Sequence, residues 1–325
     1  MYSNINSIDH IGKNAIIKTL PFPLYHGMNL LRIVPRINSL FMFYSLNTIE
    51  HRIWAKSHAN KAVSQASINQ STLNNQPFKV PKLEEQEKIG QLFQSLDKTI
   101  TLHEEKQRQL ERLKKALLQK MFADKTGYPA LRFKGFTEKW EQRKLGEIAT
   151  IVGGGTPSTK NPEYWDGDIN WYSPAEIGNQ IYTEKSERQI TELGLKKSSA
   201  KLLPVGTVLF TSRAGIGKTA ILNKEACTNQ GFQSIIPRSK MLNSYFLFSR
   251  TNSLKQYGET MGSGSTFVEV SGKQMSKMPL FIPNINEQSK IAKLFQSLDR
   301  TITLHDKKIQ YLKQLKRGLL QKMFV

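Results

Sequence analysis

The sequence predicts an α+β fold in which globular domains are joined by two long antiparallel coiled-coil helices related by a pseudo-two-fold repeat. Three observations support this prediction. A 44-residue segment occurs twice, each copy has a seven-residue apolar period with no proline inside it, and the segment between the copies alternates short strand-like runs with glycine turns. The first two indicate paired helices, and the third indicates a mixed globular domain.

The duplicated segment comprises residues 80–123 and 282–325, which align without a gap at a shift of 202 positions and are identical at 26 of 44. Pro81 and Pro283 stand just before the expected helices, where proline is tolerated. A seven-residue apolar repeat sustained over about five heptads is typical of a coiled coil. Each copy is therefore predicted to be one long helix, and the other copy is its nearest available partner.

Two series of residues spaced seven apart define the predicted helix-pairing seam: Ile89, Leu96, His103, Leu110 and Leu117, and Ile291, Leu298, His305, Leu312 and Leu319. Leu92, Leu113, Leu294 and Leu315 are expected at the other seam position. If the helices pair antiparallel, the two histidines should meet near the middle and fix the register, as polar seam residues do. A pH switch or a metal site is the alternative for this pair.

The repeat extends back from the helices into the domains. Residues 11–16 match 216–221, residues 38–43 match 243–248, Gly27 is paired with Gly231, and residues 65–69 lie opposite 267–271. The predicted organisation is a partial domain at 1–79, a helix at 80–123, a linker at 124–135, a complete domain at 136–281 and a second helix at 282–325. The first domain is expected to lack the first half of its counterpart.

Composition indicates a polyanion as partner. Lys and Arg number 47 and Asp and Glu 26, a formal net charge of +21 that is spread along the chain. Nucleic acid is the commonest partner of such a surface, and a basic protein without a DNA role is the alternative. No long apolar run predicts a membrane span or a signal peptide, and the single Cys227 fits the cytoplasm.

Loops of the complete domain carry the candidate DNA contacts. Glycine-rich backbone, hydroxyls, amides and basic side chains suit phosphates and base edges. The candidates are Gly154, Gly155, Thr156, Ser158, Lys160, Tyr172, Ser212, Arg213, Lys218 and Gln230. Trp165 and Trp171 are interpreted as core residues. Within the domain, Val205–Phe210 and Ser234–Ile236 are predicted strands, and Ser244–Gln256 is a predicted helix.

Motifs for catalysis or cofactors are incomplete. Ala214–Thr219 looks like the end of a phosphate-binding P-loop, but Ser212 stands where its first glycine is required. Cys227 has no base near it in the sequence, and the six histidines form no metal-ligand pattern. We expect no catalytic residue, no metal and no cofactor.

The pattern resembles the specificity subunit of type I restriction-modification enzymes. The resemblance is carried by the helical copies, by Tyr128–Phe133 and Trp140–Glu147 ahead of the complete domain, and by the short runs at Gly155–Pro157, Ser212–Arg213 and Asn229–Phe232. It implies two target recognition domains that each read half of a split DNA site, with the helices as spacer. It also implies partners: methyltransferase subunits that methylate adenine, and a motor-nuclease subunit that cuts DNA.

The short first domain departs from that pattern, since it lacks counterparts of Gly153–Lys160 and Trp171. A truncated or inactive specificity subunit, or a homodimer that uses two copies of the complete domain, would explain the departure. The alternatives are a stand-alone DNA-binding regulator and a coiled-coil interaction protein without a DNA role. Steep weakening of binding with salt would separate DNA readers from the last of these.

Overall fold

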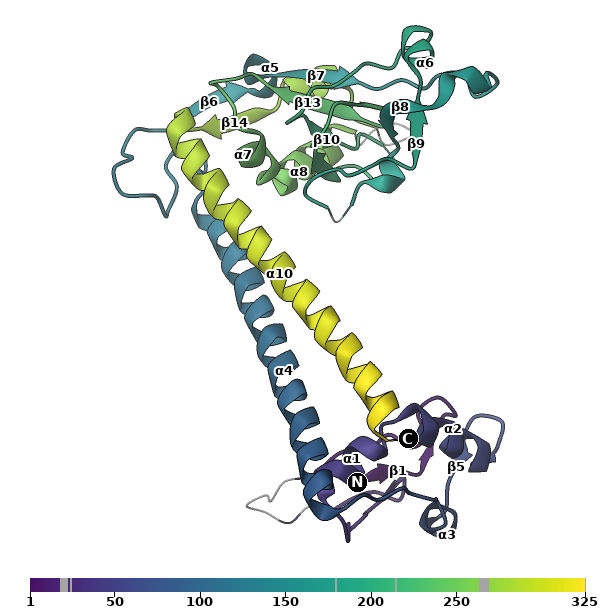
Figure 1. The fold of residues 1–325 in the computed structure, drawn as a ribbon. Coiled ribbons are helices and arrows are strands. Elements are labelled where there is room, and N and C mark those ends of the chain that lie inside the picture. Colours follow the sequence, from purple (N-terminus) through teal and green to yellow (C-terminus); the bar gives the residue numbers. More distant parts are fainter. Residues whose placement is uncertain (18–22, 24, 179, 214, 263–268, 325) are drawn as a thin grey trace. The chain divides into compact units, whose positions relative to one another are not determined.

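The computed structural model describes residues 1–17, 23, 25–178, 180–213, 215–262 and 269–324. It divides into two compact units, which are described separately below. Unit 1 is Met1–Leu110 with Ile302–Val325, and unit 2 is Glu111–Thr301. Helices and short strands occur in both, and the predicted α+β class is confirmed (Figure 1).

Two long helices pass through both units (Figure 1). Helix α4 spans Leu83–Lys120 and helix α10 spans Ile285–Met323. Their starts are built alike: the Gln86 side chain donates to the Pro81 carbonyl at 2.7 Å, and the Gln288 side chain donates to the Pro283 carbonyl at 2.9 Å. Each glutamine thus holds the turn that leads from the proline into the helix.

Within unit 1 the two helices run antiparallel, because residues farther along α4 contact residues nearer the start of α10. Lys316 contacts Asp97 at 2.5 Å, and Nδ1 of His103 lies 2.9 Å from Nδ1 of His305. Within unit 2, Lys114 contacts Asp299 at 2.5 Å, which repeats the Asp97 pair at a shift of 202. The predicted antiparallel, pseudo-symmetric helices are confirmed.

The predicted first seam is at least half-buried throughout: Ile89, Ile291 and Leu312 are buried, and Leu96, His103, Leu110, Leu117, Leu298, His305 and Leu319 are partly buried. The second seam position was predicted wrongly for three of its four residues, since only Leu294 is partly buried and packs against the core. Leu92, Leu113 and Leu315 are exposed, whereas Phe93, Ile100 and Ile309 are buried. The straight helix has 3.6 residues per turn, so a strict seven-residue reading drifts from the face that is buried.

Unit 2 contains an antiparallel four-stranded sheet in the order β11-β10-β13-β7, from Thr219–Ile221, Val208–Phe210, Gln233–Pro237 and Ala149–Gly153. A second sheet has the order β12-β8-β9, from Ala226–Thr228, Trp165–Tyr172 and Arg188–Ile190. Strand β12 is parallel to β8, and β9 is antiparallel to it. Strands β6 (Glu141–Lys144) and β14 (Pro279–Ile282) form a third pair.

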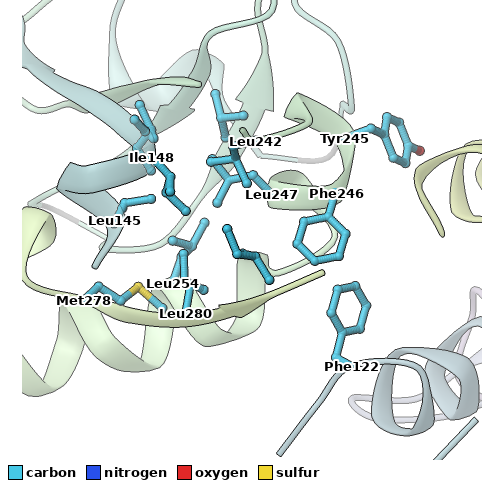
Figure 2. Close-up of a cluster of buried hydrophobic side chains, with 14 of the residues drawn as sticks. Phe122, Leu145, Ile148, Leu242, Tyr245, Phe246, Leu247, Leu254, Met278 and Leu280 are labelled. Atoms are coloured by element: carbon cyan, nitrogen blue, oxygen red, sulfur yellow. The ribbon is translucent and has the colours of Figure 1, made fainter. Parts of the chain in front are cut away.

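Short helices complete unit 2: α5 (Leu145–Ile148), α6 (Glu192–Lys196), α7 (Ser244–Phe248), α8 (Thr251–Gly262), α9 (Gly272–Ser276) and two 3-10 turns, η1 (Pro162–Tyr164) and η2 (Pro174–Glu176). The side chain of Asn243 caps α7 by accepting from the amides of Tyr245 and Phe246. Phe122 packs on Phe246 with ring centroids 5.3 Å apart in a tilted arrangement, and Figure 2 shows the two rings next to each other. Burial of this apolar cluster holds the base of the unit together.

Unit 1 is smaller in regular structure. Its elements are β1 (Tyr2–Ser3), β2 (Ile5–Asn6), β3 (Leu30–Leu31), α1 (Ser39–Ser45), α2 (Ile49–His58), β4 (Asn60–Lys61), β5 (Ala66–Ser67) and α3 (Gln70–Asn74). Strands pair as β1-β3 and β2-β5-β4. Phe324 packs on Phe41 at 5.1 Å and on Phe93 at 5.7 Å, as Phe122 packs on Phe246 and Phe295 in unit 2.

Several local predictions need correction. The strand expected from Val205 begins at Val208, because Gly206 has φ +84° and forms a turn. The helix expected at 244–256 is two helices, α7 and α8, that break at Ser249–Arg250. The structure also pairs Ser3 with Leu30 where Thr211 pairs with Phe232, so Asn29, and not Gly27, is the counterpart of Gly231. In the expected match of 65–69 with 267–271, residues 267 and 268 lie outside the described residues, whereas Ile68 and Val270 occupy equivalent places, since their amides donate to the carbonyls of Asn4 and Ser212.

The segment at 124–135, expected as a linker, packs onto the start of α10. Two guanidinium nitrogens of Arg132, Nε and Nη2, each donate to one carboxylate oxygen of Glu287 at 2.7 Å, and the Glu287 side chain is fully buried. The pKa of Arg132 is raised above its usual range, chiefly by this bond. The amide of Leu131 donates to the carbonyl of Lys120. This segment is therefore part of unit 2.

Candidate nucleic-acid interface

Three loops of unit 2 meet at one place. They follow β7 (Gly154–Lys160), β10 (212–218, apart from residue 214) and β12 (Asn229–Gly231), and we call them the loop cluster. The amide of Gly155 donates to the Thr228 carbonyl at 2.8 Å, and the amide of Ser212 donates to the Gly231 carbonyl at 2.8 Å. The hydroxyl of Thr156 lies 2.6 Å from the side-chain oxygen of Gln230. Segments far apart in the sequence thus form one surface.

Two buried tryptophans hold the first loop in place. The indole N–H of Trp171 donates to the carbonyl of Gly155 at 2.8 Å, and that of Trp165 donates to the carbonyl of Ser158 at 3.1 Å. Both rings are buried and pack edge to face, as expected for core tryptophans. The two tryptophans therefore fix the loop conformation from the core, and the exposed side chains of the loop remain accessible to a ligand.

The glycines of the first loop serve close packing. A Cβ on Gly154 would lie 2.0 Å from the Asn229 carbonyl oxygen, and one on Gly155 would lie 2.3 Å from the Ser199 backbone carbon. The Gly155 amide is already donated to Thr228. This amide is therefore already in use inside the protein, because its hydrogen cannot be offered to a phosphate without breaking the bond to Thr228.

Most of the other candidates are accessible. Ser158, Lys160, Arg213, Lys218 and Gln230 are exposed and Thr156 is half-buried. Two cationic side chains, Arg213 and Lys218, come from one loop, and Lys160 comes from another. The cluster therefore combines three positive charges with the paired Thr156 and Gln230.

Tyr172 and Ser212, which were expected to contact DNA, are both buried. Tyr172 is 3% exposed, its ring packs in a core cluster, and its hydroxyl donates to the Glu184 carbonyl. Burial raises the pKa of this tyrosine. Ser212 is fully buried, with its backbone bonded to Gly231 and Val270. Both residues support the loops from inside and are shielded from a ligand.

Arg188 is a candidate that the sequence did not suggest. It is exposed, and its guanidinium carbon lies 3.5 Å from the centroid of the Trp165 ring. Because Trp165 is bonded to the loop at Ser158, this cation–π contact places a fourth positive charge beside the cluster. Arg188 is on β9, and no local motif links it to the loop.

Unit 1 repeats this chemistry only in part among its described residues: exposed Lys13 is the counterpart of Lys218, but Arg213 has no basic counterpart. Ile68 donates to the carbonyl of Asn4 as Val270 donates to that of Ser212, so Asn4 and Ser212 are structural counterparts. The next residue is Ile5 in unit 1 and Arg213 in unit 2. The backbone frame is shared, whereas the charged side chain is not.

Other possible chemistries find little support. Cys227 is fully buried, and burial raises its pKa to about 12, so the thiol stays protonated and packs as a small apolar group. Among the described residues, no group of three or more His, Cys, Asp or Glu side chains could hold a metal ion. None of the described helices is both long and apolar enough to cross a bilayer.

The long helices carry a second accessible surface. Leu102 on α4 and its repeat counterpart Leu304 on α10 are 66% and 56% exposed. Tyr311 is 58% exposed and follows Leu304 by two turns on the same face of α10. Leu304 and Tyr311 thus place two exposed apolar side chains on one face of α10, and Leu102 places one at the equivalent position of α4.

Comparison with known proteins identifies the family. Residues 4–112 and 137–314 match the sequence model of the type I restriction modification DNA specificity domain. The chain is 37% identical to the type I restriction enzyme MjaIX specificity subunit of Methanocaldococcus jannaschii over 190 residues, which cover 57% of this chain and 44% of that protein. It is 27% identical to the putative MjaX specificity subunit of the same organism, with 98% of this chain and 76% of that protein covered.

Solved structures share the fold. The S subunit of a type I restriction-modification system from M. genitalium matches with a TM-score of 0.61 at 17% identity, covering 89% of this chain and 73% of that chain. The HsdS subunit from Thermoanaerobacter tengcongensis matches with a TM-score of 0.54 at 18% identity, covering 88% and 69%. Since the family model matches in both halves and spans most of the sequence, the chain belongs to the type I restriction modification DNA specificity family.

Proposed function

We propose that this protein reads double-stranded DNA through the loop cluster of unit 2 and directs the enzymes of a type I restriction-modification complex to its target. The observation that carries the proposal is the gathering of exposed Lys160, Arg213 and Lys218 around the Thr156–Gln230 pair. Family membership supports the same reading. Sequence choice would come from this chain, and adenine methylation and cleavage from its partners.

The side chains suit a division of labour at the DNA. Lysine contacts phosphates as a compact charge, whereas arginine and glutamine can form paired hydrogen bonds with base edges in the major groove. We therefore assign Lys160 and Lys218 to the backbone and Arg213 and Gln230 to base reading. The net charge of +21 adds a long-range attraction for DNA.

The helices are proposed to dock methyltransferase subunits, which would bind S-adenosylmethionine themselves. The exposed Leu102 and Leu304 support this assignment, because the same apolar position is presented by both copies of the repeat. Two equivalent surfaces fit two copies of one partner. A motor-nuclease subunit would join the same assembly, and this chain would contribute no catalytic group.

DNA binding by charge-neutralised variants tests the reading surface. We expect Lys160→Ala and Lys218→Ala to weaken binding about equally on all sequences and to reduce the salt slope by about one each. Arg213→Ala should cost about tenfold and relax specificity at one base pair. Lys115→Ala, which removes an exposed lysine from α4, is the matched control. Equal losses in all four variants would reject the assignment.

Methylome sequencing of cells that express the chain with its methyltransferase tests the biological role. Modified adenines in one fixed motif would support a specificity subunit, and their loss in the Arg213→Ala variant would tie the motif to the loop cluster. Binding to DNA without co-purifying methyltransferase would instead favour the stand-alone regulator. Because unit 1 has Ile5 where unit 2 has Arg213, the DNA footprint should be strongest over the half-site read by unit 2.

A further inference from the structure

Unit 1 contains a groove with a volume of about 520 Å³, lined by both polar and apolar side chains. Its apolar lining includes Ala15, Ile16, Ile17 and Val34, together with Met42 and Phe43 of α1. Ile16, Ile17 and Val34 are 40%, 48% and 71% exposed. Three neighbouring apolar side chains with this exposure indicate a surface that lacks its cover.

The internal repeat shows what covers the same surface in unit 2. Asn14–Ile16 corresponds to Thr219–Ile221, and Phe43 corresponds to Phe248. The amide of Ile221 donates to the carbonyl of Ile181 at 2.7 Å, and the amide of Thr183 donates to the carbonyl of Ile221 at 2.9 Å. Tyr182 is thereby paired with Ile221 in parallel.

This cover accounts for the difference in burial between the two units. In unit 2, Ile221 is 3% exposed and the adjoining Leu222 is 1% exposed, and Ile181 packs against the core that includes Phe248. In unit 1 the counterparts Ile16 and Ile17 are the exposed residues of the groove. In unit 2 the extended segment Ile181–Thr183 shields the edge at Ile221 from water. Among the described residues of unit 1, no such segment pairs with the edge at Ile16.

The backbone of unit 1 is oriented to accept such a segment. The amide of Ala15 donates to Met1, and the amino group of Met1 donates to the carbonyl of Ala15, both at 2.9 Å. Successive residues of an extended chain direct their N–H and C=O groups to opposite sides. Those of Ile16 therefore point away from Met1, and among the described residues no backbone hydrogen bond to Ile16 occurs.

We propose that the groove of unit 1 binds an extended strand of a second polypeptide whose side chains resemble those of Ile181–Thr183 in unit 2. The strand would pair in parallel with Ile16 and place an apolar side chain like that of Ile181 over Phe43. Strand addition of this kind takes affinity from backbone hydrogen bonds and specificity from side-chain pockets. A second copy of this chain is the weaker occupant, because its own Ile181–Thr183 segment is already bonded in unit 2.

Disulfide trapping on the full-length chain tests the site. The probe is a peptide with the sequence of residues 180–187, in which cysteine replaces the residue equivalent to Tyr182. The full chain carries Ile16→Cys or, as the matched control, Ile53→Cys, which is 63% exposed on α2 of the same unit. Native Cys227 is fully buried and serves as the background in the unmodified chain.

We expect at least tenfold more peptide adduct at Ile16→Cys than at Ile53→Cys in a mild redox buffer. Replacing the threonine equivalent to Thr183 by proline removes the amide N–H that should donate to the carbonyl of Ile16. This replacement should lower the adduct yield at Ile16→Cys and leave the yield at Ile53→Cys unchanged. Equal yields at the two positions, or no effect of the proline, would overturn the proposal. A disulfide-linked dimer of the Ile16→Cys chain in place of the adduct would show that a second copy is the occupant.

Discussion

The Arg132–Glu287 pair offers a sharp test, because the duplicated helix supplies its own control. Glu287 is in the first turn of α10, is fully buried and is held by two guanidinium bonds of 2.7 Å. Its repeat counterpart Glu85 is in the first turn of α4 and is exposed. The same substitution can therefore be made at equivalent positions with and without the ion pair.

Glu287→Gln leaves the shape of the side chain but removes its charge. Arg132 is only 13% exposed, so its positive charge would remain with little water to solvate it. Breaking one partner of a buried pair costs about 3–5 kcal/mol, and we place this variant near the lower figure because glutamine can still accept one bond. Glu85→Gln should change the stability by less than about 0.5 kcal/mol, as for most exposed positions.

Urea unfolding followed by tryptophan fluorescence is the assay. Trp140, Trp165 and Trp171 belong to unit 2 and Trp54 to unit 1, so the signal reports mainly the unit that contains the pair. A double variant, Arg132→Met with Glu287→Leu, should recover most of the loss, since an apolar pair has no charge to desolvate.

The reasoning fails if Glu287→Gln and Glu85→Gln shift the urea midpoint equally, or if the double variant is no more stable than Glu287→Gln. Either result would mean that the buried charge of Arg132 is not the source of the penalty. Equal shifts would point to the helix N-terminus, which both glutamates share.

Three further tests address other parts of the chain. Burial lowers the pKa of His51 to about 4, so unfolding takes up a proton between pH 6.5 and 4. The free energy of unfolding of unit 1 should therefore fall by about 2 kcal/mol from pH 7 to 5. Hydrogen exchange under urea should detect this fall in the unmodified chain and not in His51→Gln. His103→Leu or His305→Leu alone should destabilise more than both together in a double-mutant cycle, because each single change leaves one imidazole unpaired in the seam. Gly155→Ala should lower DNA affinity at least tenfold in a binding titration, whereas Gly178→Ala, with open space around it, should not.

The repeat and its period allowed much of the fold to be predicted. Proline-free heptads gave both long helices to within three residues at their ends, and the shared histidine predicted the contact that the structure places at 2.9 Å. Local signals did less well where neighbours decide. Gly206 forms a turn, so the strand begins later than predicted. The helical conformation is interrupted at Ser249–Arg250, although the composition would allow one continuous helix.

Exposure of the candidate residues could be predicted only in part. Residue type suggested Lys160, Arg213 and Lys218 as DNA contacts, and these side chains are exposed. It also suggested Tyr172 and Ser212, which are buried, because a hydroxyl looks the same in a sequence whether it faces water or a core. Arg188 was missed, since its place depends on stacking over Trp165, and no spacing rule connects the two.

By itself, the sequence determined the duplicated helices, their antiparallel pairing, the net charge and the family resemblance. The helices follow from apolar residues at regular intervals and the charge from residue counts, and both can be read directly from a sequence. Only the tertiary structure decided which loops meet, which polar side chains remain exposed and that the edge at Ile16 is open where that at Ile221 is covered. Burial is set by distant segments that share no period, and it becomes visible only when the chain has folded.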